Sequence, residues 1–368
     1  MSDKYNPPRR VGSVTIDICV AFSLIHKIIN GRDKKIPEWK AEEKVYMNEL
    51  KEEVMRWPTD PKLPVDLVSD ETKLYFLIAT RDHLDIFRML QQYLQVDFNN
   101  TFTTLEDYNE TLKESDCDLP SICAFTEELN LLHISCWNGW YELAKELLEN
   151  HGVDVNAQDE LGNTPLMIVL GSGKERRDEI TDLLLNQPKI DLDFCDNGGL
   201  TAAFYIFLSD IYDEEKEDEG KDLRLKMMKK LVKHGADVTK GQSILSQCAT
   251  DLWFNIFDEV RGMIILGDER TERVTPEMVQ FLVEAGCCVT KEVAATVRLL
   301  YPGLVPLCEA RLHTPPSLQV LARAGVRRRL AEAARHPSSD QTFLRRIEQL
   351  QTSRRLPTTL VKYINCEM

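Results

Sequence analysis

The chain has 368 residues, of which 43% are hydrophobic and 29% charged, as in ordinary globular proteins, and no apolar run approaches the length of a membrane span. Its net charge of −15 is unevenly spread, because residues 311–368 carry +7 (11 Lys or Arg, 4 Asp or Glu) and residues 1–310 carry −22 (34 and 56). The acidic body would repel phosphates, which argues against a nucleic-acid partner, and the asymmetry predicts two functional parts.

The ten cysteines show neither the spacing of a zinc site nor the framework of a small secreted domain. We therefore expect free thiols that pack as small apolar residues in a reducing compartment. Residues 14–25 follow two arginines as in a signal peptide, but Asp17 interrupts the apolar run and no small-residue cleavage site follows it. We predict a cytoplasmic protein without a membrane partner and leave entry into the nucleus open.

Two amphipathic helices are predicted after a polar, Pro-rich start at residues 1–12. Four apolar residues share one face of the first helix: Ile18, Phe22, Ile25 and Ile29. We expect this helix to stop at Asn30-Gly31. The second helix follows Pro37 and has four large apolar residues at helical spacing: Met47, Leu50, Val54 and Trp57.

Residues 73–99 predict a pair of short helices. Leu77–Ala79 belong to the first helix, Asp82-His83 to the turn, and the second helix carries Ile86, Met89 and Leu90. Residues 100–128 lack this pattern and contain eight acidic residues. They form either an eroded copy of the helical pair or an inserted loop.

Residues 129–152 contain the clearest helical pair of the chain. The first helix surrounds His133 and is followed by Gly139, which suits a turn between two short helices. Leu147 and Leu148 are apolar residues of the second helix, and Gly152 suits its C-cap.

A tight turn follows this pair and leads into another helix. Gly162 supplies the positive φ that such a turn needs. Thr164 suits the N-cap of the next helix and Pro165 its first position, where a missing N–H costs nothing. Residues 129–166 therefore resemble an ankyrin repeat, in which a turn joins two antiparallel helices.

The motif recurs along the chain. Met167 stands 34 residues after His133 and Phe204 a further 37, against about 33 in ankyrin repeats. The end of the second helix recurs before Gly235 and again before Gly286. We predict an all-α fold, with an ankyrin-repeat solenoid of about five or six repeats, some of them degenerate, in residues 67–312.

Two interruptions lie within the later repeats. The acidic run 213–219 separates the helices of the fourth recognisable repeat, either as a solvated loop or as a contact for a basic partner. The fifth repeat has its first helix near Ile244–Cys248 and its second after Thr275-Pro276. Residues 291–312 could hold one truncated repeat. Residues 1–66 form an N-terminal extension that either caps the first repeat, which we favour because solenoid ends need covering, or binds a partner.

The composition turns basic after Pro315-Pro316. Ser317 suits an N-cap, and Leu318, Ala322 and Val326 then share one face of a helix. Further apolar residues at helical spacing predict a second helix: Phe343, Leu344, Ile347 and Leu350. The end of the chain reads Leu356-Pro357-Thr-Thr-Leu360-Val-Lys-Tyr363-Ile364.

Residues 313–368 resemble a SOCS box of three helices. The pattern Ser-Leu-x-x-x-Ala-x-x-x-Val is similar to its elongin-binding box, and Leu-Pro-x-x-Leu-x-x-Tyr-Ile is similar to its cullin box. Their order, spacing and place behind ankyrin-like repeats identify the chain as similar to the ankyrin repeat and SOCS box family.

This resemblance implies a substrate-recognition subunit of an elongin B/C–cullin-5 RING ubiquitin ligase. The partners would be elongin C, elongin B, cullin-5, a RING-box protein and an unknown protein substrate that is ubiquitinated and degraded. The residues implied to bind elongin are Ser317, Leu318, Leu321, Ala322 and Val326. Those implied to bind cullin are Leu356, Pro357, Leu360 and Tyr363.

The chain departs from the family pattern at two places. Ala322 replaces the usual cysteine of the elongin-binding box, a small residue that still fits. Arg354-Arg355 replace the first apolar pair of the cullin box, which leaves the choice of cullin open.

A non-catalytic ankyrin scaffold is the alternative function, with the C-terminal helices as a structural cap only. An enzyme has little support, because no nucleophile elbow, P-loop or HExxH motif is present. His133, His151 and His234 occupy structural positions of the repeats. We therefore predict no catalytic residues, no metal and no cofactor.

Overall fold

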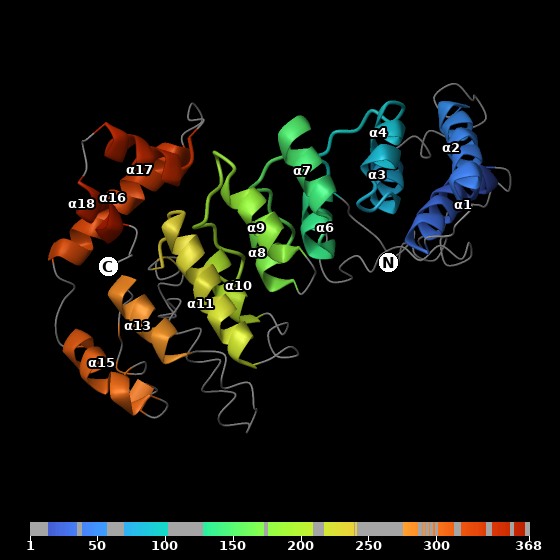
Figure 1. The fold of residues 1–368 in the computed structure, drawn as a ribbon. Helices are drawn as coiled ribbons and strands as arrows, with labels where there is room; N and C mark the ends of the chain where they lie inside the picture. Colours follow the sequence, from blue (N-terminus) through green and yellow to red (C-terminus); the bar gives the residue numbers. More distant parts are fainter. Residues whose placement is uncertain are drawn as a thin grey trace, which may run out of the picture. The chain divides into compact units, whose positions relative to one another are not determined.

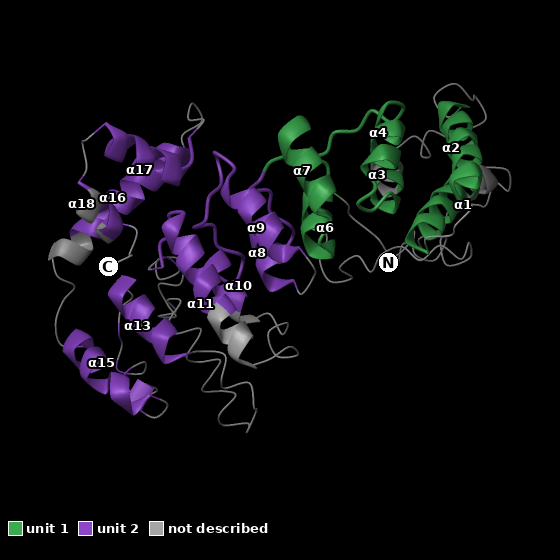
Figure 2. Cartoon of the chain, in the orientation of Figure 1, with its two compact units in different colours: residues 1–154 green, residues 155–368 purple. Residues whose placement is uncertain are grey.

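The computed structural model describes residues 14–34, 39–56, 70–101, 128–172, 176–208, 217–238, 240, 275–285, 289, 291, 294, 297–298, 301–312, 318–335, 341–353 and 357–364. Every regular element in these ranges is a helix, and an isolated bridge between Cys195 and Thr201 is the one β-type pairing among them. The helices are labelled in Figure 1. The chain divides into two compact units, residues 1–154 and 155–368 (Figure 2), which we describe separately.

The first unit begins with helices α1 (Val14–Asp33) and α2 (Trp39–Arg56), which pack against each other. Phe22, Ile25 and Ile29 are buried on α1, as are Leu50 and Val54 on α2, which confirms the predicted faces at these positions. Met47 is half-buried, and Trp57 and the side chain of Ile18 lie outside the described residues. The predicted stop at Asn30-Gly31 is wrong, because α1 continues to Asp33. A Cβ on Gly31 would lie 1.9 Å from the Trp39 ring. This glycine therefore permits close packing of the two helices and does not end one of them.

The helical pair α3 (Asp70–Ala79) and α4 (Leu84–Gln91) follows, as the sequence predicted. Helix α1 packs on α3, where the rings of Phe22 and Phe76 stack with centroids 4.2 Å apart, and α2 packs on α4. Arg32 donates to both carboxylate oxygens of Asp85, at 2.8 and 2.5 Å, and to Glu43. The hydrogen bond from Arg32 holds the pKa of Asp85 below its usual value.

Helices α6 (Leu131–Asn138) and α7 (Tyr141–Asn150) form the next pair of this unit. Asn130 caps α6, because its side chain accepts from His133 N at 3.1 Å while its own N–H donates to His133 Nδ1 at 3.2 Å. Gly139 has φ +75° and forms the C-cap of α6. Gly152 has φ +61° and directly follows the C-cap of α7.

The second unit opens with α8 (Pro165–Gly171), α9 (Arg177–Leu185), α10 (Ala202–Leu208) and α11 (Glu217–Lys233). Thr164 caps α8 by accepting from Met167 N, and Pro165 takes its first turn, as predicted. The positive φ of Gly162, +82°, is also confirmed. The turn at Gly162 is tied to the corresponding turn of the following repeat, because Asn197 N donates to Leu161 O at 2.8 Å.

A recurring side-chain contact links the loops after the second helices. In the first unit, Asn99 accepts from Asp154 N at 2.9 Å. In the second unit, Asn156 accepts from Asp191 N and Asp193 from Asp237 N, both at 2.8 Å. The similar sequence endings at these positions therefore supply an acceptor for the backbone of the next repeat.

Helix α13 (Pro276–Ala285) begins after Thr275, whose hydroxyl accepts from Met278 N, and confirms the predicted start at Thr275-Pro276. A 3-10 turn (Pro302–Leu304) and α15 (Val305–Leu312) follow. The predicted helix at 244–248, the segment 102–127 and most of the acidic run 213–219 lie outside the described residues; residues 217–219 belong to α11.

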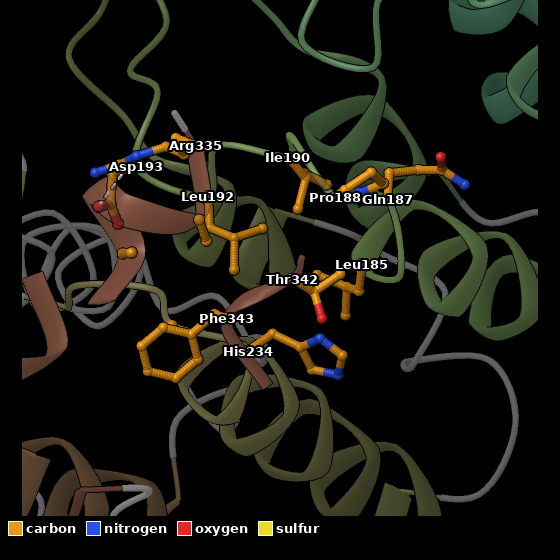
Figure 3. A pocket seen from close by; sticks show the side chains of 13 residues that line it. Leu185, Gln187, Pro188, Ile190, Leu192, Asp193, His234, Arg335, Thr342 and Phe343 are labelled. Carbon is orange, nitrogen blue, oxygen red and sulfur yellow. Dashed lines mark hydrogen bonds and ion pairs between the residues drawn. The ribbon is translucent and has the colours of Figure 1, made fainter. Parts of the chain in front are cut away.

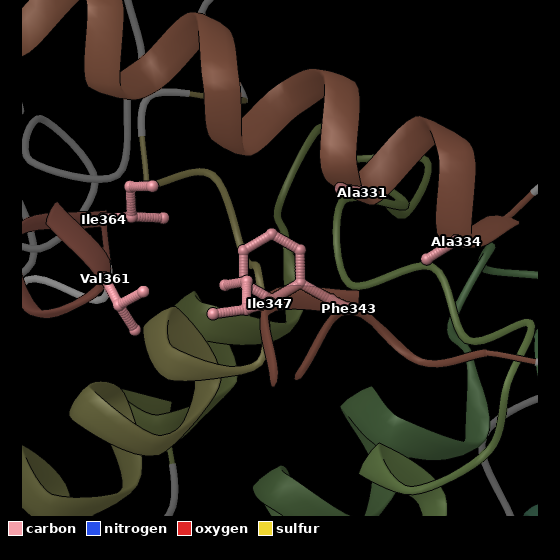
Figure 4. Close-up of a cluster of buried hydrophobic side chains, with 6 residues drawn as sticks. All are labelled: Ala331, Ala334, Phe343, Ile347, Val361 and Ile364. Carbon is pink, nitrogen blue, oxygen red and sulfur yellow. The ribbon is translucent and has the colours of Figure 1, made fainter. Parts of the chain in front are cut away.

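The chain ends in three helices, α16 (Leu318–Arg335), α17 (Phe343–Thr352) and α18 (Thr358–Ile364). They pack together around six buried residues: Ala331, Ala334, Phe343, Ile347, Val361 and Ile364. Figure 4 shows Phe343 and Ile347 between the side chains of α18 and those of α16. We call residues 318–364 the C-terminal segment.

Candidate protein-interaction site

Helix α16 presents two different faces. Arg323, Arg327, Ala331 and Ala334 are at most 8% exposed and face inward. Ala322 and Val326 are exposed, Val326 by 42%. The helix thus turns Arg323 and Arg327 toward the protein, while Ala322 and Val326, which we call the apolar stripe, face solvent.

Arg327 is the central contact of the inward face. Its guanidinium donates to the carbonyl oxygens of Val232, in the last turn of α11, and of Ala236, just beyond that helix, and to Ile364 O at the end of α18. It also lies 5.3 Å from the centroid of the Phe343 ring. The last carbonyls of a helix have no partner within the helix and carry the negative end of its dipole. One buried cation therefore serves two helix ends at once.

Three further arginines of α16 bind other parts of the second unit. Arg323 donates to Glu284 O, in the last turn of α13. Arg328 pairs with Asp237 at 3.3 Å, and Arg335 pairs with Asp191 and with Asp193. Burial raises the pKa of Asp193 above its usual value, whereas the nearby Lys240 and Arg335 act in the opposite direction.

Phe343, at the start of α17, packs directly on Gly235. A Cβ on that glycine would lie 2.9 Å from Phe343 Cγ. Thr342 caps α17 by accepting from Arg345 N and places the ring at this point. Where the C-terminal segment meets the repeats there is a small pocket, lined mainly by apolar side chains together with His234 and Thr342, with Asp193 and Arg335 at one end (Figure 3).

Helix α18, like α16, has one face that is buried and one that is exposed. Val361 and Ile364 are buried in the cluster of Figure 4. Pro357 and Leu360 are exposed, Leu360 by 41%. Among the described residues, Val326 and Leu360 are two of six large apolar side chains with at least 41% exposure.

The structure describes the side chains of four of the nine residues that the sequence assigned to partner binding. Ala322, Val326, Pro357 and Leu360 all lie at the surface. Ser317, Leu356 and the side chains of Leu318, Leu321 and Tyr363 lie outside the described residues.

Sequence reasoning missed the arginines that hold the C-terminal segment. Arg323 and Arg327 each follow a residue of the apolar stripe. Their spacing of four residues indicates that they share one face of the helix, but not which atoms they bind. The acceptors of Arg327 in and just after α11 are 95 and 91 residues away in sequence, so nothing local identifies them. Gly235 did carry a signal, because its place at a helix end indicated positive φ, and φ is +112°.

Comparison with known families decides what the helical pairs are. A family model described as ankyrin repeats, in three copies, matches residues 132–242. These residues form ankyrin repeats. No curated protein matches the chain. The matched ankyrin repeats contain the helices from α6 to α11. Ankyrin repeats are in general non-catalytic modules that bind other proteins, which indicates a role in protein–protein interaction.

The titratable residues of the ankyrin repeats have structural contacts. The ring of His133 accepts from the backbone of Asn130, and the His151 ring lies beside those of Phe87 and Phe98, with centroids 6.2 and 4.6 Å away. Burial lowers the pKa of His151 and of His234. Within the described part of the chain, no three His, Cys, Asp or Glu side chains are grouped to hold a metal ion. The helices described there include none that is long and apolar enough to span a membrane.

Proposed function

We propose that this chain is the substrate-recognition subunit of an elongin B/C–cullin-5 RING ubiquitin ligase. The ankyrin repeats bind a target protein, and the C-terminal segment binds elongin C, together with elongin B, and cullin-5 with its RING-box protein. The chain itself carries out no chemistry. It raises the local concentration of the target beside the ubiquitin-loaded enzyme.

The observation that carries the proposal is the exposure of the stripe on α16. Exposed apolar residues on a helix that is anchored on its other side favour a docking surface for another protein. Ala322 and Val326 are the described members of the elongin-binding pattern, and both are exposed. Pro357 and Leu360 of the cullin pattern are exposed as well.

A structural cap is the second candidate, and a specific observation favours it. The C-terminal segment covers Gly235 and donates to the last carbonyls of α11 and α13, as a cap would. A cap alone does not require Val326 of the elongin-binding pattern and Leu360 of the cullin pattern to be exposed. The two functions are also compatible, since one face of α16 can cap the repeats while the other binds a partner.

The test uses Leu318, the anchor of the proposed elongin-binding box. Truncation of an interface anchor costs about 2–4 kcal/mol, which corresponds to about 30-fold to 1,000-fold in affinity. Leu318→Ala should therefore abolish co-purification of elongin B/C, while circular dichroism shows the ankyrin repeats still folded. Unchanged elongin binding would refute the proposal and leave the cap.

Cullin binding needs a separate measurement because Arg354-Arg355 replace an apolar pair of the cullin box. We expect weakened binding of cullin-5 to the elongin-bound complex, with an affinity that falls as salt rises. Titration at low and high salt tests this. A complex that binds elongin but no cullin at either salt would be an adaptor without ligase function.

A further inference from the structure

On α16, each described residue of the apolar stripe is adjacent in sequence to an inward-facing arginine. Ala322 directly precedes Arg323, and Val326 directly precedes Arg327. At 3.6 residues per turn, neighbouring side chains are about 100° apart around the helix. Whatever holds the two arginines inward therefore directs the apolar stripe outward.

The acceptors of these arginines define one rotational setting of the helix. Arg323 reaches the end of α13, and Arg327 reaches the ends of α11 and α18. All are backbone oxygens at or near the end of a helix, where a cation is favoured. A rotated α16 would withdraw both guanidinium groups from these oxygens.

Without the arginines, burial of apolar surface would favour a different setting. The small pocket where the segment meets the repeats is lined by apolar side chains of the repeats, Leu185, Ile190 and Leu192, beside Ala331 and Ala334 of α16. An exposed stripe that includes Val326 gains free energy by turning toward such a surface. Buried charged groups often set the register of a contact rather than its stability.

We infer that Arg323 and Arg327 are positioning residues that set the rotation of α16 and keep its apolar stripe available to a partner. The inference rests on the proposed function in one respect, namely that this partner is elongin C. In the absence of the arginines the stripe packs against the chain's own repeats, and the binding surface is hidden.

The experiment measures the accessibility of position 326 in the full chain. Val326→Cys is labelled with a maleimide, and its labelling rate is read from the modified peptide by mass spectrometry. In the Val326→Cys background, Arg327→Ser removes the donors and should slow labelling at least tenfold. Arg329→Ser, an exposed arginine of the same helix, is the matched control and should leave the rate unchanged. Arg327→Lys keeps a donor and should restore most of the rate.

Equal or faster labelling after Arg327→Ser would overturn the inference, because the segment would then have detached rather than turned. If that variant loses the circular dichroism of the repeats, Arg323→Ser carries the same test through the contact with Glu284 O.

A parallel titration with purified elongin B/C separates the two proposals. Arg327→Ser should weaken elongin binding at least tenfold and Arg329→Ser should not. If the unsubstituted chain does not bind elongin although labelling slows as expected, the proposed function fails and the setting of α16 stands. If elongin binds and labelling is unchanged, the positioning role fails and the proposed function stands.

Discussion

Substitution of Gly235 by alanine tests how the C-terminal segment is held on the ankyrin repeats. Its φ of +112° lies in the region that L residues avoid, and an added Cβ would meet Phe343 Cγ at 2.9 Å. The backbone strain costs about 1–2 kcal/mol, and overpacking against the ring costs a further 1–3 kcal/mol or so. The strain acts on the stability of the repeats, docked or not, and only the overpacking acts on the docking equilibrium, where about 1–3 kcal/mol corresponds to about 5-fold to 160-fold.

Gly152→Ala is the matched control. Gly152 also has positive φ, +61°, but a Cβ added there would have no other atom within 4 Å. It should therefore cost only the strain of about 1–2 kcal/mol. Because it lies in the first unit, it should leave the C-terminal segment protected.

Hydrogen exchange measured by mass spectrometry reports the two effects separately. Gly235→Ala should accelerate exchange in α17 and α18 far more than in α6 and α7. Adding Phe343→Leu to the Gly235→Ala variant should partly reverse this acceleration, because the smaller side chain removes the ring atoms that the new Cβ meets. If Gly235→Ala costs no more than Gly152→Ala and leaves exchange in α17 unchanged, Phe343 does not hold the segment on Gly235.

Two other predictions concern the first unit, with one control in α16. Gly31→Ala should lower the thermal midpoint of unfolding, because a Cβ 1.9 Å from the Trp39 ring forces α1 and α2 apart, at a cost of about 1–3 kcal/mol or more. The control Gly325→Ala has open space around the added Cβ and should instead stabilise α16 by up to about 1 kcal/mol. Equal shifts of the thermal midpoint in the two variants would refute the packing role of Gly31. Glu146→Gln should destabilise the protein at pH 7. The hydrogen bond from Arg88 lowers the pKa of Glu146, so the stabilisation is present above the ordinary glutamate pKa and is lost as pH falls through the lowered value. Urea unfolding should therefore show a smaller difference in the free energy of unfolding between variant and parent at pH 3 than at pH 7. A difference that stays constant would contradict this account.

The ankyrin repeats were predictable because their signals are local. Gly139, Gly162 and Thr164 each satisfy a backbone requirement within a few residues of themselves, and the structure places each as expected. The predicted end of α1 failed for the opposite reason. Gly31 is read locally as a helix stop, but its role comes from Trp39 on the neighbouring helix.

The positive charge of the C-terminal segment shows the same limit. Its composition predicted a separate functional part, and four of its arginines turn out to bind the rest of the second unit: Arg323, Arg327, Arg328 and Arg335. Their acceptors are backbone carbonyls or distant carboxylates, which no sequence pattern marks. The exposed stripe was predictable from spacing, but the device that holds it outward was not.

The carbonyls served by Arg327 also decide how this protein can be shortened in the laboratory. Removing residues 313–368 is the obvious way to separate the repeats from the proposed ligase arm. Such a truncation would also strip the arginine donors from Val232, Ala236 and Glu284 and uncover Gly235. A target lost from the shortened chain would then report a frayed last repeat as readily as a missing contact. Full-length variants such as Leu318→Ala keep the repeats covered, and they are the reagents with which targets should be sought.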